Sequence, residues 1–133
     1  MDTNVLVAAL RSQQGASFEI FRRLRFGEWK AVLSNHLLFE YEEVFRRQAL
    51  ELGLTFKDVD QLLNAICARG EECLLSHIWQ PILVDPDDEP LVQLALESNA
   101  LRIVTHNVRH LLPAVALGVE VLRPGTFLDK LRS

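Results

Sequence analysis

The chain lacks the features that mark several specialised protein classes. It has two cysteines in 133 residues, Cys67 and Cys73, which are too few for a disulfide framework or a zinc site. The apolar run Val5–Leu10 is too short to cross a bilayer, and it follows Asp2 rather than the positive region of a signal peptide. We therefore expect a soluble cytoplasmic protein with no membrane partner.

Basic residues are not in excess either. The chain carries 14 Lys and Arg against 18 Asp and Glu, for a formal net charge of -4. Nonspecific nucleic-acid binding normally depends on a basic excess, so any nucleic-acid contact must be local. The sequence also has no Walker loop, no GxGxxG and no GxSxG elbow, and no cysteine or serine stands in a context typical of a nucleophile. Chemistry carried by carboxylate side chains is the class that these absences leave.

What is present is an apolar content of 49% and a regular alternation of short apolar runs with longer helical patterns. This alternation predicts one α/β domain over residues 1–133, with a mainly parallel sheet covered by helices on both faces. The predicted strands are 3–7, 31–33, 81–84, 101–104 and 119–122. The predicted helices are 16–28, 35–51, 56–69, 88–98 and 108–116, with a short one after Pro124. The topology of 50–80 stays open.

Two acids stand where structure alone would favour another residue. Asp2 directly precedes the run that we expect to be a buried central strand, where a carboxylate needs a positive partner. A solvated chain end is the alternative. Glu40 falls at the edge of the apolar stripe of its predicted helix, whereas Glu42 and Glu43 rotate toward solvent. The alternative for Glu40 is an ordinary ion pair with a base such as Arg47.

A third acid and an amide follow later in the chain. Asp88 begins a predicted helix and shares a face with Leu91 and Val92, so it points toward the core while Glu89 points outward. A helix-capping role is the alternative for Asp88. Asn107 stands at the carboxyl end of the predicted strand 101–104, where it too could be an ordinary helix cap.

Four blocks of sequence contain these residues: DTNVLVAAL, SNHLLFEYEEV, DPDDEPLVQLAL and IVTHNVRHLL. In this order and at these intervals, they resemble the PIN-domain family of metal-dependent ribonucleases. The resemblance is closest to the bacterial branch that includes the toxins of toxin-antitoxin modules, and it runs from Asp2 to at least Leu112. It implies a three-layer α/β/α sandwich with a PIN-like central sheet and an endoribonuclease that hydrolyses RNA phosphodiester bonds.

The resemblance also implies which residues do the chemistry. The expected catalytic and metal-binding residues are Asp2, Glu40, Asp88 and Asn107. The residues expected to hydrogen-bond around them are Asn4, Asp87 and Thr105, and Arg109 is the expected RNA contact. Gathered carboxylates repel one another unless a cation offsets their charge, and hard oxygen ligands favour Mg2+ or Mn2+ over zinc.

Two positions depart from the family pattern. Family members have several apolar residues before the first acid, whereas here Asp2 follows Met1, so we expect a shortened first strand and a native chain that starts upstream or is clipped. Asn107 stands where many members have an aspartate. A site with three anionic ligands favours one tightly held ion over two.

The remaining expectations concern partners and alternative functions. We expect RNA as substrate, with an antitoxin protein and a second copy of the chain as protein partners. The arginines of the predicted helix 16–28 are better explained as a solvated face than as an RNA surface. His106 and His110 lack the glutamate of a zinc motif and suit surface or supporting roles. The alternatives are a catalytically weak PIN-like module that binds RNA or protein, and a DNA nuclease.

Overall fold

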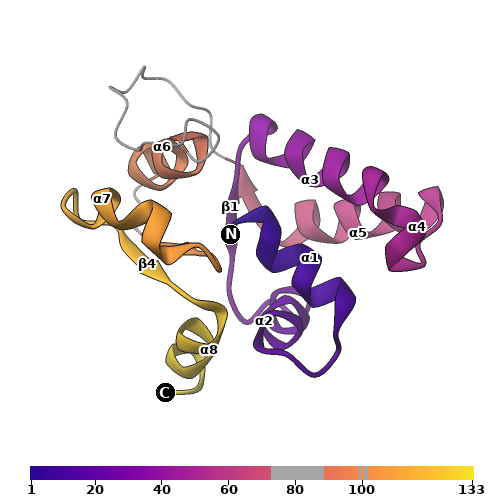
Figure 1. The fold of residues 1–133 in the computed structure, drawn as a ribbon, viewed down its shortest axis with the longest axis horizontal. Coiled ribbons are helices and arrows are strands. Elements are labelled where there is room, and N and C mark those ends of the chain that lie inside the picture. The colour runs from indigo at the N-terminus through magenta and orange to yellow at the C-terminus, as the bar shows by residue number, and fades with distance from the viewer. Residues whose placement is uncertain (73–88, 99, 101) are drawn as a thin grey trace.

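The computed structural model describes residues 1–72, 89–98, 100 and 102–133. Over these residues, helices alternate with short strands (Figure 1). The α-helices are α1 Thr3–Arg11, α2 Ala16–Arg25, α3 Asn35–Arg47, α4 Ala49–Leu52, α5 Phe56–Arg69, α6 Glu89–Ser98, α7 Leu112–Val115 and α8 Pro124–Arg132. The strands are β1 Ala31–Leu33, β2 Gly70–Glu72, β3 Arg102–Val104 and β4 Glu120–Leu122, and a 3-10 helix, η1, covers Val108–Leu111.

The described strands form two separate parallel pairs, β1 with β2 and β3 with β4. Helices α3, α4 and α5 lie between β1 and β2 in the chain, and η1 and α7 lie between β3 and β4. Parallel neighbours need such crossovers because a hairpin turn cannot join them. Helix α6 packs against both β1 and β3, so one helix covers both pairs. The fold is therefore α/β with parallel strands, as predicted.

The prediction of a strand over residues 3–7 is wrong, because these residues open helix α1. Asp2 has an extended backbone with φ -68° and ψ 147° and stands at the N-cap of that helix, a position that favours aspartate. Val5 and Leu6 are adjacent, and both are almost fully buried. The run therefore has apolar residues on more than one side, and its sequence shows no clear period that would separate a helix from a strand. Its length and its leucine and alanine content favour the helix.

The other predicted strands agree better with the structure. β1 covers the predicted range 31–33, while β3 and β4 lie inside the predicted ranges 101–104 and 119–122. The predicted strand 81–84 lies outside the described residues. β2 was not predicted: it follows α5 without a break, in the stretch whose topology the sequence left open.

The predicted helices are confirmed with changed boundaries. The helix over 56–69 is confirmed as α5, whereas the predicted helix 35–51 divides at Gln48 into α3 and α4. The predicted helix 108–116 begins as the 3-10 helix η1 and continues as α7, which has Pro113 in its first turn. Proline has no amide hydrogen to donate to the preceding turn, so a continuous α-helix cannot run through this position.

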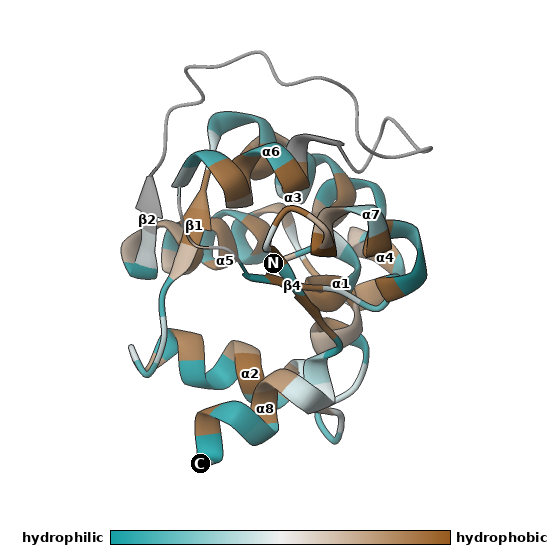
Figure 2. Cartoon of the chain, turned by 90° about the vertical axis from the view of Figure 1, so that its left-hand side faces the viewer, coloured by the Kyte–Doolittle hydropathy of each residue, from teal (hydrophilic) through white to brown (hydrophobic). Residues whose placement is uncertain are grey.

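Two clusters of buried side chains form the core. The larger one joins α1, α3, α5 and α6 to β1 and β3, and it includes Tyr41 and Leu111. The smaller one packs Val5 and Ile20 against the side chains of α8, around β3 and β4. Helices α2 and α6 each show an apolar and a polar face (Figure 2). In the described parts of the chain, no helix has both the length and the apolar character that a bilayer crossing requires.

Candidate functional site

The start of α1 and the end of β3 lie side by side at the candidate site. The backbone N–H of Asp2 donates to the carbonyl oxygen of Val104 at 2.9 Å, which joins the first residues of the chain to the last residue of β3. Asp2 is half-buried. Its carboxylate therefore stands at the carboxyl end of a strand, the edge where functional groups gather in open parallel sheets.

Thr105 links two of the predicted site residues through one hydroxyl group. It directly follows β3 and is fully buried. Its Oγ1 donates to Asp2 Oδ2 at 2.6 Å and accepts the backbone N–H of Asn107 at 3.0 Å. Asn107 stands at the N-cap of η1 without a capping bond from its side chain, which is exposed. The structure thus brings Asp2, Thr105 and Asn107 together from opposite ends of the chain.

Glu40 reaches the same region from α3. That helix begins directly after β1, where the Ser34 hydroxyl caps it by accepting the Leu37 N–H at 3.1 Å. Glu40 is half-buried, and its Oε2 accepts the hydroxyl of Thr3 at 2.8 Å. Because Thr3 follows Asp2 in the chain, this bond ties Glu40 to the residue next to the first acid.

The alternative for Glu40, an ion pair with Arg47, does not occur. Arg47 Nη1 lies 3.2 Å from Glu43 Oε1 instead, on the exposed side of α3. The predicted rotation is confirmed for Glu43, which faces solvent, and for Glu40, which faces α1. Glu42 is half-buried and pairs with Arg46 at 3.4 Å.

Tyr41 is a buried residue whose pKa responds to the charges of the two acids, Asp2 and Glu40. It is fully buried, and its hydroxyl donates to the carbonyl oxygen of Met1. Burial raises the pKa of Tyr41 well above its ordinary value, and the charges of Asp2 and Glu40 raise it further. Burial also lowers the pKa of the Met1 amino group, against the opposing effect of Asp2. Both acids thus act on one buried phenol.

Asn4 and His106 lie on the outer side of the site. The His106 backbone N–H donates to Asn4 Oδ1 at 3.4 Å, which places Asn4 beside the loop after β3. The His106 Nε2 lies 3.2 Å from Ser17 Oγ, and Arg123 donates to the His106 carbonyl oxygen at 3.3 Å. His106 is exposed and precedes η1, which agrees with a supporting rather than a metal-binding role.

Three further residues were predicted for the site. Asp87 and Asp88 lie outside the described residues. Arg109 is exposed in η1, two residues after Asn107. Within the described part of the chain, no three His, Cys, Asp or Glu side chains come together as a metal-binding group. The described donors, the carboxylates of Asp2 and Glu40 and the side-chain oxygen of Asn107, are hard oxygen ligands of the kind that Mg2+ and Mn2+ prefer.

Arg22 and Arg23 of α2 form ion pairs within their own helix. Arg22 Nη2 lies 2.7 Å from Glu19 Oε1, and Arg23 Nε lies 3.0 Å from the same oxygen. Hydrogen bonds from Arg22 and then Arg23 lower the pKa of Glu19 to about 2. This arrangement agrees with the interpretation of α2 as a solvated charged face.

Two residues of the site were missed in the sequence. Thr3 was assigned to a strand, so its bond to Glu40 could not be foreseen, although the polar run Asp2, Thr3 and Asn4 before an apolar segment is a helix-start signal. Tyr41 belongs to the apolar stripe of the predicted helix 35–51, and no sequence signal indicates that its hydroxyl reaches Met1.

Comparison with known proteins adds one finding. A family model described as PIN domain matches residues 1–109, which include every described residue of the site except Arg123. A search of curated proteins and a search of solved structures each found no match.

Proposed function

Because the chain belongs to the PIN domain family, we propose that it is a metal-dependent endoribonuclease that hydrolyses RNA phosphodiester bonds. The observation that carries the proposal is the bridge at Thr105, whose hydroxyl donates to the Asp2 carboxylate at 2.6 Å and accepts the Asn107 backbone N–H at 3.0 Å. A buried hydroxyl that holds a carboxylate in one orientation is typical of the supporting shell of a metal ligand. A solvated chain end has no such partner.

The proposed ligands of Mg2+ or Mn2+ are Asp2, Glu40, Asp88 and Asn107. When bound, such an ion lowers the pKa of a water molecule and stabilises the charge that develops on the leaving oxygen. Thr105 and Thr3 orient the carboxylates of Asp2 and Glu40 through the bonds described above. Tyr41 keeps its proton because its pKa is raised, so its hydroxyl serves as a donor to the backbone and not as a base.

The charge of the ligand set favours one resident ion. Asn107 contributes a neutral oxygen where an aspartate would contribute a full negative charge. Three carboxylates can balance one divalent ion, but a second ion would meet little remaining negative charge. We therefore propose a single tightly held ion, with a second one arriving together with the RNA phosphate.

RNA is the proposed substrate, and Arg109 is the proposed contact to its backbone. Arg109 is exposed two residues after Asn107, so its guanidinium can meet a phosphate next to the site without being buried. The net charge of -4 makes the rest of the surface a poor electrostatic trap for RNA. Binding is then expected to be concentrated at the site.

We also propose a biological setting in which this nuclease is the toxin of a toxin-antitoxin module and acts in the cytoplasm. Its proposed protein partners are an antitoxin and a second copy of the chain. Large apolar side chains on the surface support such contacts: Phe26, Phe39, Leu50 and Phe56 are each at least 68% exposed. Light scattering of the purified chain, alone and with the product of a neighbouring reading frame, tests both partners.

We also propose how the helices and strands are arranged in layers. We infer that the two parallel pairs belong to the central sheet of a three-layer α/β/α sandwich that forms one domain. The packing of α6 against both β1 and β3 supports a common layer for the two pairs. An experimental structure of the chain tests this inference directly.

The second candidate function is a catalytically weak PIN-like module that binds RNA or protein. Asn107 favours it, because loss of one anionic ligand weakens metal binding and with it the activation of water. This candidate predicts RNA binding that does not depend on metal and is not followed by cleavage.

A metal titration separates the candidates. Cleavage of a labelled RNA is followed as Mn2+ or Mg2+ is added to the native chain, to Asp2→Asn and to Asp88→Asn. Glu43→Gln serves as the matched control, because Glu43 is an exposed acid of α3 that pairs with Arg47. We expect metal-dependent cleavage by the native chain and the control, and at least about 100-fold slower cleavage by both site variants.

Each other outcome has a definite meaning. Cleavage that persists in Asp88→Asn would remove Asp88 from the site, and binding without cleavage in every form would favour the weak module. Faster cleavage of single-stranded or flapped DNA than of RNA in the same assay would assign the chain to the DNA nucleases.

A further inference from the structure

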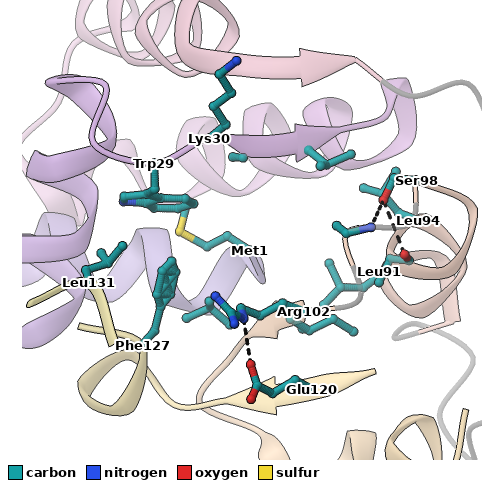
Figure 3. A pocket seen from close by; sticks show the side chains of 16 residues that line it. Met1, Trp29, Lys30, Leu91, Leu94, Ser98, Arg102, Glu120, Phe127 and Leu131 are labelled. Carbon is teal, nitrogen blue, oxygen red and sulfur yellow. Dashed lines mark hydrogen bonds and ion pairs between the residues drawn. The ribbon is translucent and has the colours of Figure 1, made fainter. Parts of the chain in front are cut away.

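The cavity of about 390 Å³ that lies between the two strand pairs is lined mainly by apolar residues. Figure 3 shows Trp29 and Phe127 on the side of this cavity away from α6. The arginine of this cavity, Arg102, bonds the acid Glu120 at 2.7 Å across the β3–β4 pair. Its positive charge is therefore already paired.

Another cavity, of about 640 Å³, lies where α2 and α8 begin. The two helices pack against each other, and Figure 2 shows them side by side. Small residues such as Ala8, Ala16 and Gly125 line part of this cavity and leave room close to the backbone. The polar and charged residues that line it are Ser12, Ser17, His106, Arg123, Thr126 and Asp129. Of these, only Ser17 is buried, so the cavity is open to solvent.

His106 joins this cavity to the candidate site. It lines the cavity and directly precedes Asn107 in the chain. Its Nε2 lies 3.2 Å from the hydroxyl of Ser17, and its backbone N–H donates to Asn4 Oδ1 at 3.4 Å. The loop after β3 is thus a wall that the cavity shares with the proposed metal site.

Arg123 brings an unpaired positive charge to the cavity. Ion pairs with acidic side chains hold Arg11, Arg22, Arg23, Arg46, Arg47 and Arg102. Within the described part of the chain, Arg123 has no such pair, and its Nη1 instead donates to the carbonyl oxygen of His106 at 3.3 Å. A guanidinium has further N–H donors in a planar fork that matches the oxygens of a phosphate. The carbonyl bond therefore places the group and leaves donors for an anion.

The position of Arg123 suits an RNA backbone that crosses the loop after β3. Arg123 contacts the residue directly before Asn107, and the proposed RNA contact Arg109 is exposed two residues after Asn107. Proteins follow the phosphates of a single strand with cations placed along a groove. A scissile phosphate at Asn107 would then have a neighbouring phosphate on the side of Arg123.

We propose that the cavity where α2 and α8 begin is a phosphate subsite for single-stranded RNA, in which the Arg123 guanidinium binds a backbone phosphate that neighbours the scissile one. The identity of the ligand rests on the proposed function, whereas Arg123 itself lies outside residues 1–109, which the family model matches. Ser17 and His106 form the wall beside Arg123. Asp129 lines the same cavity and limits the strength of the subsite by repelling the phosphate.

The test measures RNA binding without metal. Binding of a labelled single-stranded RNA is followed by fluorescence anisotropy in EDTA over a series of salt concentrations. Arg123→Gln removes the charge, and the matched control Arg132→Gln removes an exposed arginine from the other end of α8. We expect Arg123→Gln alone to weaken binding by at least about fivefold at low salt. It should also lower the slope of log affinity against log salt by about 0.7, the contribution of one phosphate of a single strand.

Two further variants separate a charge contact from a structural role. Arg123→Lys keeps the charge, so it should retain the salt slope. Asp129→Asn removes the repelling acid and should tighten binding by at least about twofold. Calorimetric titration with inorganic phosphate and with a 5'-mononucleotide tests free phosphate as the ligand, and we expect both to bind more weakly than RNA.

Cleavage kinetics keep this inference apart from the nuclease proposal. Arg123→Gln should raise KM and leave kcat nearly unchanged, because the contact is equally strong in the ground state and the transition state. Absence of cleavage together with binding that depends on Arg123 would reject the nuclease and leave the subsite standing. Cleavage by the native chain, with equal RNA affinity of native and Arg123→Gln protein, would reject the subsite and leave the nuclease standing.

Four other results would overturn the subsite. Equal weakening by Arg132→Gln would show a nonspecific effect of charge. Weaker binding by both Arg123→Gln and Arg123→Lys at an unchanged salt slope would make Arg123 only a support for the His106 loop. Free phosphate that needs Arg123, while RNA does not, would assign the cavity to free phosphate. Failure of every form to bind RNA, with or without metal, would remove RNA as the ligand.

Discussion

At the scale of single residues, the site depends on hydroxyl groups that hold carboxylates. Thr105 is fully buried and bonds both Asp2 and the Asn107 backbone, and Thr3 bonds Glu40. Such bonds restrict the orientation of a carboxylate. The acids are therefore positioned before any ligand arrives.

Replacing Thr105 tests this arrangement. Thr105→Val keeps the shape of the side chain but leaves the Asp2 carboxylate and the Asn107 backbone N–H without the Thr105 hydroxyl as partner. We expect a loss of about 10- to 100-fold in Mn2+ affinity or in the cleavage rate, because supporting bonds of this kind have effects of that size. Thr105→Ser keeps the hydroxyl and should retain most of both. Calorimetric Mn2+ titration measures affinity, and equal values for the two variants would contradict the role of the hydroxyl.

Glu19 provides a pH dependence at the same scale. Its pKa is lowered from 4.5 to about 2, first by the hydrogen bond from Arg22 and then by that from Arg23. Its contribution to stability is therefore present above pH 4.5 and is lost as the pH falls toward 2.

The measurement compares the urea stability of the native chain with that of Glu19→Gln between pH 7 and pH 3. We expect a small difference that is largest at pH 7 in low salt, because exposed pairs are screened by ions. It should shrink below pH 4.5, the ordinary pKa of the group. Glu28→Gln, 3.7 Å from Arg23, is the control, and a difference that grows on acidification would refute the assignment.

At the scale of elements, helix starts decide where the acids lie. Asp2 stands at the N-cap of α1, and Ser34 caps α3, whose sixth residue is Glu40. Two helices that begin beside strand ends thus deliver one acid each. The Ser34 hydroxyl also stabilises α3 by satisfying a backbone amide that has no partner within the helix.

Substitution of two capping residues tests whether the cap of α3 affects cleavage in addition to stability. The hydroxyls of Ser34 and Thr55 each accept a backbone N–H at 3.1 Å, in α3 and α5. We expect Ser34→Ala and Thr55→Ala each to lower the free energy of unfolding by about 1 kcal/mol. Only Ser34→Ala should also slow metal-dependent cleavage, because α3 carries Glu40. Urea unfolding and the RNA assay measure the two effects, and equal loss of activity in both variants would point to stability alone.

At the scale of the whole molecule, a shared core joins segments that are distant in sequence. The larger cluster contains residues from α1 through Val119, so both strand pairs depend on it. Loss of a side chain in this cluster should weaken the entire described fold rather than one element.

Substitution of two adjacent leucines, one in η1 and one in α7, tests how far the buried core extends. Leu111 is 0% exposed, whereas Leu112 is 53% exposed. We expect Leu111→Ala to lower the free energy of unfolding by about 2 to 5 kcal/mol, because it leaves a cavity in the core. Leu112→Ala should change it by less than about 0.5 kcal/mol. Thermal and urea unfolding measure both, and a similar small effect of the two would contradict the extension of the core to this segment.

Much of the fold and of the candidate site could be predicted from the pattern of residues, and the errors of the prediction have physical causes. The helix over 56–69 was predicted correctly because it has a clear period and a capping sequence that includes Thr55. The strand predicted over 3–7 was wrong because the run from Val5 is buried on most sides, and a run without polar positions has no visible period. The bond between Thr3 and Glu40 joins residues 37 apart, which local patterns do not report.

The sequence by itself determined the α/β class, the family and the candidate acids, because periodicity and spaced motifs are local properties of the chain. Only the tertiary structure decided that Thr105 bonds Asp2 across 103 positions and that Asp2 stands at the N-cap position of a helix. It also decided that, among the described residues, β1 and β3 belong to separate strand pairs and line a common cavity. The physical reason is that strand neighbours and side-chain hydrogen bonds depend on which segments meet in space, and short runs of sequence carry no record of their distant partners.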